Sequence, residues 1–76
     1  MPAIVVIDRN NFRQVCKDNG ITPNSVIFSR ITWRLAKIEQ LEDVGMANCD
    51  AAQLMQQELE SLFAKLTKQL YGEVNV

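Results

Sequence analysis

The chain has 76 residues, of which 47% are hydrophobic and 22% are charged, and its net charge at pH 7 is −1. This length allows one small domain with a thin core, and the composition excludes a disordered tail, a collagen-like chain and a disulfide scaffold. The most apolar run, residues 3–7, is far shorter than the roughly 18 residues of a membrane span, so we expect no membrane partner.

The N-terminal residues 1–8 are predicted to form a short strand or an extended arm, because the β-branched run of residues 3–7 ends at Asp8. A single strand must satisfy its backbone hydrogen bonds with a partner. The rest of the chain offers no second strand. We therefore expect this segment to be an arm, or to pair with another subunit or a foreign sheet edge.

Residues 9–19 are predicted to form a short helix, with Asp8 as its cap and Gly20 at its end. Its apolar face would carry Phe12, Val15 and Cys16. Its basic flank would carry Arg9, Arg13 and Lys17.

A long helix is predicted over residues 23–44, with Thr22 as N-cap, Pro23 at the first helical position and Gly45 as the stop. Its main apolar seam has the spacing of a coiled coil and comprises Phe28, Ile31, Leu35 and Ile38, widened by Ile27 and Leu41. A second apolar side carries Val26, Trp33 and Val44, and the basic residues Arg30, Arg34 and Lys37 run between the two sides. A helix with two apolar sides is usually packed on both.

A second long helix is predicted over residues 50–71, with Asp50 and Gln53 resembling a capping box and Asn48 as a rival cap. Its seam comprises Met55, Leu59, Leu62, Leu66 and Leu70, with Ala52 and Phe63 beside it. Two helices of equal length and a short loop predict an antiparallel hairpin. The expected fold is mainly α, a single domain that assembles as a homodimer or with another protein.

The charges divide unevenly along the chain. Residues 1–38 carry six basic and two acidic side chains, whereas residues 39–76 carry two basic and seven acidic ones. The two halves could attract one another in a hairpin or a head-to-tail dimer, or the basic half could face an anionic partner. Ordinary solvated helix faces would give the same distribution.

Catalytic and metal-binding patterns are not found in the sequence. The chain has no histidine, and its two cysteines, Cys16 and Cys49, lie 33 positions apart. We therefore expect no metal, no cofactor and no enzymatic activity. No basic segment precedes a hydrophobic stretch at the N-terminus, so we expect no signal peptide, a cytoplasmic location and two unpaired thiols.

The segment from Phe12 to Ile31 resembles a helix-turn-helix motif, because Cys16, Gly20 and Val26 have the spacing of its close helix crossing. This resemblance implies a small DNA-binding regulator that dimerises through its last helix. The residues that would approach DNA are Asn24, Ser25, Arg30 and Arg34. Two more, Arg13 and Lys17, would lie near phosphates.

The preferred hypothesis is a non-enzymatic protein–protein interaction module, such as an adaptor, regulator or inhibitor of a larger assembly. Its size is typical of accessory proteins of phages and plasmids. The predicted partner-binding residues lie outside the main seam, and they are Trp33, Arg30, Arg34, Lys37, Val26 and Val44. Tryptophan and arginine dominate binding hot spots, so Trp33 is the predicted anchor. Burial of Trp33 within one subunit would remove the main support for this hypothesis.

Overall fold

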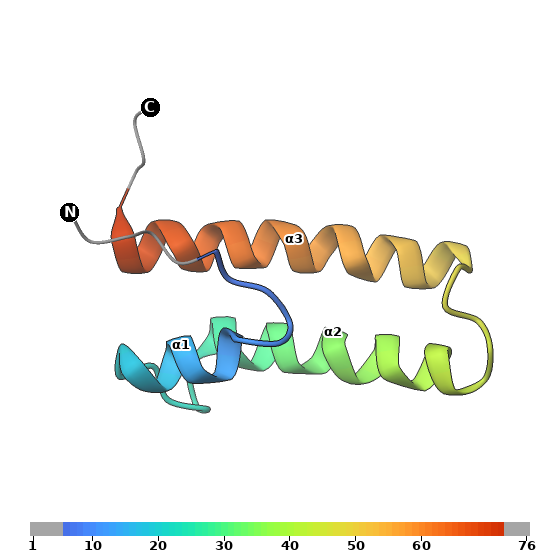
Figure 1. Ribbon diagram of the computed structural model, residues 1–76, viewed down its shortest axis with the longest axis horizontal. Coiled ribbons are helices and arrows are strands. Elements are labelled where there is room, and N and C mark those ends of the chain that lie inside the picture. The colour runs from blue at the N-terminus through green and yellow to red at the C-terminus, as the bar shows by residue number, and fades with distance from the viewer. Residues whose placement is uncertain (1–5, 73–76) are drawn as a thin grey trace.

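The computed structural model describes residues 6–72, and within that range it contains three α-helices and no strand. Helix α1 spans Phe12–Asp18, α2 spans Val26–Asp43 and α3 spans Asp50–Tyr71. Figure 1 shows α2 and α3 side by side as an antiparallel pair, joined by a short loop at one end. The predicted helical hairpin is therefore confirmed, and homodimer formation stays a prediction.

The predicted strand falls largely on residues 1–5, which lie outside the described residues, and residues 6–8 form no strand. Ile7 is buried, whereas its neighbour Val6 is 79% exposed. Ile7 packs into the same apolar cluster as the helices. In the described part, the segment before α1 is therefore a non-strand arm that ends in a turn, and it is attached to the hairpin through buried Ile7 and the Arg9–Glu42 ion pair.

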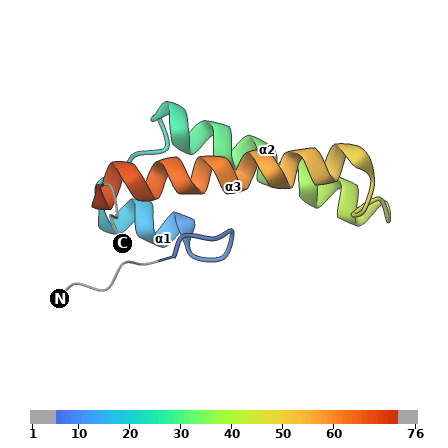
Figure 2. The same ribbon diagram turned by 90° about the horizontal axis from the view of Figure 1, so that it is seen from above.

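Helix α1 packs against the half of the hairpin where α2 begins and α3 ends (Figures 1 and 2). Its fully buried Phe12 ring lies 5.4 Å from the Phe28 ring and 6.1 Å from the Phe63 ring, measured between centroids. These separations are typical of favourable aromatic pairs. α1 is thus fixed to the side of the hairpin that carries Phe28 and Phe63.

The core follows both predicted seams. Burial is nearly complete for Ile31, Leu35 and Ile38 of α2 and for Ala52, Leu59, Leu62 and Leu66 of α3. Other seam residues are partly buried against this cluster, namely Ile27, Phe28, Met55, Phe63 and Leu70. The apolar spacing of the sequence therefore identifies the inner faces of both long helices.

The first two helices begin three residues later than predicted. The Asp8 carboxylate accepts hydrogen bonds from the backbone N–H groups of Asn10 and Asn11 at 2.8 and 3.0 Å, which closes a turn before α1. Asp8 therefore caps this turn, and the prediction that it caps the helix is wrong. Its side-chain geometry suits both roles, because Asp stabilises local turns as well as helix starts.

Helix α2 is capped by Ser25, whose hydroxyl accepts a hydrogen bond from Phe28 N–H at 3.3 Å, so the predicted Thr22 cap is wrong. Ser25 N–H donates to the Thr22 carbonyl at 3.0 Å and encloses Pro23 in a turn. Proline suits this turn and the first position of a helix equally, because its fixed φ fits both.

Helix α3 starts at the predicted Asp50, but its N-cap is Cys49, whose Sγ accepts a hydrogen bond from Ala52 N–H at 3.4 Å. Neither proposed cap, Asp50 or Asn48, is the capping residue. The first two helices end one residue earlier than predicted, at Asp18 and Asp43, and the predicted stops Gly20 and Gly45 adopt φ values of 73° and 75°. Such left-handed positions favour glycine, which has no Cβ.

Candidate partner-binding groove

The predicted partner-binding residues share one face of α2. At about 100° per residue, Val26, Arg30, Arg34, Trp33, Lys37 and Val44 fall within an arc of about 100° beside the core face. Within this arc, Trp33 is 52% exposed, Val26 66% and Val44 68%. The second apolar side of α2 is therefore left open by the described part of the chain, and Trp33 is not buried under α1.

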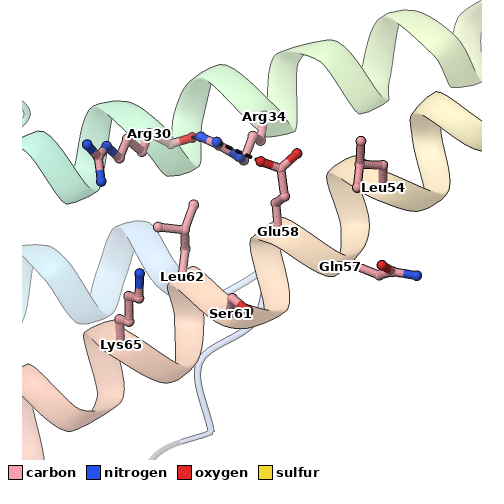
Figure 3. A pocket seen from close by; sticks show the side chains of 8 residues that line it. All are labelled: Arg30, Arg34, Leu54, Gln57, Glu58, Ser61, Leu62 and Lys65. Atoms are coloured by element: carbon pink, nitrogen blue, oxygen red, sulfur yellow. Dashed lines mark hydrogen bonds and ion pairs between the residues drawn. The ribbon is translucent and has the colours of Figure 1, made fainter.

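Helix α3 supplies the other wall of a groove beside this face. A hollow of about 400 Å³ is lined by Arg30, Arg34, Leu54, Gln57, Glu58, Ser61, Leu62 and Lys65 (Figure 3). A second hollow of about 320 Å³ shares Arg30, Leu62 and Lys65 with the first and continues to Val26. We call the two together the α2/α3 groove. Helix α1 packs on the opposite side of the hairpin, against Phe28 and Phe63.

Arg34 is held firmly in the floor of this groove. Its Nη2 donates to Glu58 Oε2 at 2.9 Å, and its Nη1 donates to the Arg30 carbonyl at 3.0 Å, as Figure 3 shows. Its Nε is buried and has no hydrogen-bond partner within residues 6–72. Of the three basic residues between the two apolar sides of α2, Arg34 therefore forms an ion pair with the acidic last helix.

Three other cations lie in or beside the groove: Arg30 and Lys65 line it, and Lys37 lies on the adjoining face of α2. Among the described residues, Arg30, Lys37 and Lys65 form no ion pair. The Trp33 ring lies 5.7 Å from the Arg34 guanidinium carbon and 5.8 Å from Lys37 Nζ, within range of cation–π attraction. The face of α2 beside the groove thus combines a half-exposed indole with positive charge that has no acidic partner among the described residues.

Acidic side chains gather on the other side of the hairpin. A hollow of about 320 Å³ there is lined by Asp8, Arg9, Glu60 and Phe63 among others, and Arg9 also pairs with Glu42 at 3.1 Å. The Arg9–Glu42 and Arg34–Glu58 pairs each join the basic half of the sequence to the acidic half. In the described part, the basic and acidic halves therefore attract one another within one chain at these two contacts.

The residues proposed for DNA contact do not form one surface. Arg13 and Lys17 lie on α1, on the side of the hairpin opposite to Arg30 and Arg34. Arg13 lies 5.0 Å from the Phe12 ring. The connection from α1 to α2, residues 19–25, is longer than the 3–4 residues of a typical helix-turn-helix.

At the start of α2, Asn24 is exposed, whereas the Ser25 hydroxyl is engaged in capping. Ile27 and Phe28, which follow, are partly buried in the core. The first turns of α2 therefore offer few free polar groups for reading bases, and DNA binding stays an untested alternative.

The predicted binding set contains none of the six α3 residues that line the first hollow, among them Leu54, Glu58 and Lys65. Leu54 is 57% exposed and lies outside the Met55–Leu70 seam. The sequence contains a signal for these three residues, because Leu54, Glu58 and Lys65 are four and seven positions apart and so share one face of a helix. That spacing identifies a face, but it does not show that the face borders α2.

In the described part of the chain, we find no cluster of side chains arranged for catalysis or for metal binding. No group of three or more potential metal-ligating side chains occurs within residues 6–72. Burial raises the pKa of the Cys16 thiol, which disfavours a reactive thiolate. In the same range, no helix is long and apolar enough to cross a membrane.

Comparison of the chain with protein-family models, with curated proteins and with solved structures finds no match.

Proposed function

We propose that the protein is a non-enzymatic interaction module that binds a larger protein through the α2/α3 groove. The observation that carries the proposal is the exposure of Trp33, which is 52% accessible on a helix face beside that groove. Tryptophan combines a large apolar surface with few rotamers, so it is favoured as a binding anchor. Exposed apolar surface that is rimmed by polar and charged side chains is typical of protein–protein interaction sites.

The groove suits a different protein better than a second copy of itself. Arg30 and Lys65 line the groove and Lys37 lies on the adjoining face of α2, whereas the one acidic side chain lining the groove, Glu58, is already paired with Arg34. Two grooves facing each other would bring like charges together, which costs binding free energy. Any homodimer is therefore proposed to use another face, leaving the groove to a larger partner that the protein regulates or inhibits.

A photo-crosslinking amino acid with a large aromatic side chain, placed at position 33 so that an aromatic anchor is kept, tests this proposal in a lysate of the protein's own host. The matched control carries the same amino acid at Gln14, an exposed position of α1. We expect one defined protein to be captured at position 33, to persist after nuclease treatment and to be missing at position 14. Equal capture at both positions would contradict the proposal. Nucleic acid captured at position 33 would instead favour the DNA-binding alternative.

A further inference from the structure

We infer that the α2/α3 groove takes an amphipathic helix of about 18 residues whose central side chains are acidic. This inference rests on the proposed function and names the class of partner that the same groove binds. It follows from the spacing, the charge and the apolar surface of the residues that line the groove and of the adjoining α2 face, which carries Trp33, Lys37 and Val44.

The spacing of exposed residues sets the length. Val26 and Val44 lie on the same side of α2 and are eighteen positions apart, which is about 27 Å at 1.5 Å per residue. Between them, Arg30 and Lys37 are seven positions apart, or about 10.5 Å. A helix laid along α2 repeats its side chains at the same interval. Acidic residues two turns apart on such a helix therefore face Arg30 and Lys37, while apolar residues near its ends reach the two valines.

The charge of the groove selects an acidic occupant. Within residues 6–72, Arg30, Lys37 and Lys65 have no acidic partner, and the carboxylate of Glu58 is engaged by Arg34. The surface therefore presents an excess of positive charge that a carboxylate-bearing partner neutralises. Long basic side chains on two facing helices can approach one occupant from both sides, and Arg30 and Lys65 line both hollows of the groove.

The apolar surface favours a peptide over a nucleic acid. Leu54, Trp33 and Val26 are each more than half exposed around the cations. Phosphate backbones would meet the cations but leave these side chains uncovered, whereas the apolar stripe of an amphipathic helix covers them. On the opposite side of the hairpin, α1 already provides this kind of cover through Phe12. The partner helix would complete the equivalent packing over the groove.

Trp33 is the chain's single tryptophan, so its fluorescence reports occupation of the groove. The probe is an 18-residue amphipathic peptide without tryptophan, with leucines on one face and glutamates seven apart beside it. The control peptide carries lysine in place of each glutamate. We expect a saturable blue shift of Trp33 emission with the glutamate peptide, weakened by added salt, and none with the lysine peptide.

Charge-neutralising variants locate the contact. R30Q/K37Q should weaken binding of the glutamate peptide by about tenfold or more, and R30K/K37R should keep it. The matched control R13Q/K17Q removes the same charge from α1 and should change the affinity by no more than about twofold. Circular dichroism on each variant verifies that the helices are intact.

Three results would overturn the inference: equal binding of both peptides, unchanged affinity of R30Q/K37Q, or no shift with the glutamate peptide. If a protein is still crosslinked at position 33 in any of these cases, the interaction function stands and only the acidic-helix partner is wrong. If crosslinking at that position fails as well, the proposed function falls with it.

Discussion

Arg34 on α2 and Glu58 on α3 are joined by an ion pair of 2.9 Å that spans the floor of the groove. The two residues are 24 positions apart, so the pair fixes one long helix relative to the other. Their side chains are 20% and 38% exposed, which places the contact between a surface ion pair and a buried one. The pair therefore positions α2 and α3 at the floor of the groove, and it supplies only a small part of the free energy of folding.

Glu58→Gln should lower the free energy of unfolding by about 0.5–1 kcal/mol, because the variant keeps the side-chain shape and removes the charge. A double-mutant cycle with Arg34→Met in urea isolates the pairwise energy. Added salt should shrink that energy. A coupling energy near zero at low salt would show that the pair does not hold the helices together.

Gly45→Ala should destabilise the fold by about 1–2 kcal/mol, which is the cost of placing a Cβ in the left-handed region. Gly45 has a φ of 75°, and no atom beyond its two chain neighbours lies within 4 Å of the position a Cβ would take. The cost therefore comes from the backbone alone. Gly45→Asn is the control, since asparagine tolerates this conformation better. Urea unfolding curves check the prediction, and equal loss in both variants would contradict it.

Phe12→Ala should cost about 3–5 kcal/mol, because it deletes a fully buried ring that contacts Phe28 and Phe63. In a domain this small, that loss approaches the whole free energy of folding. Phe12→Leu should cost less, and the exposed control Gln14→Ala should stay within about 0.5 kcal/mol. Wild-type stability in Phe12→Ala would mean that α1 contributes nothing to the fold.

The two thiols should differ in reactivity. Cys16 is buried and its pKa is raised by desolvation, whereas Cys49 is partly exposed. A thiol reagent should label Cys49 rapidly and Cys16 only at the rate of unfolding. Because Cys16 ionises less readily in the folded chain than in the unfolded one, stability should fall as pH rises above the thiol's unfolded pKa. Replacement of Cys16 by alanine should remove that fall. Rapid labelling of both thiols at neutral pH would contradict this placement.

The sequence predicts the core better than the helix starts. The spacing of Ile31, Leu35 and Ile38 identifies the buried face because burial repeats with the helical period. Helix starts are ambiguous because Thr22, Asn24 and Ser25 can each cap, and the backbone turn around Pro23 decides among them. Cysteine is not among the residues that usually cap helix N-termini, so the sequence gives no indication that Cys49 caps α3.

The candidate site was predictable only on one of its two helices. The exposed face of α2 follows from its own sequence, since Val26, Trp33 and Val44 fall outside the main seam. The α3 wall depends on which residues of the two helices lie opposite one another. That alignment is set by the loop and by packing, so the position of Glu58 against Arg34 requires the structure.

The most direct test of Trp33 as the binding anchor measures unfolding and partner binding on the same variant, Trp33→Ala. Because the ring is half exposed and outside the core cluster, the free energy of unfolding should change by no more than about 0.5 kcal/mol. Affinity for the partner captured at the groove should fall by about tenfold or more. Loss of stability with unchanged affinity would show that Trp33 serves the fold, and that the groove is not the binding site.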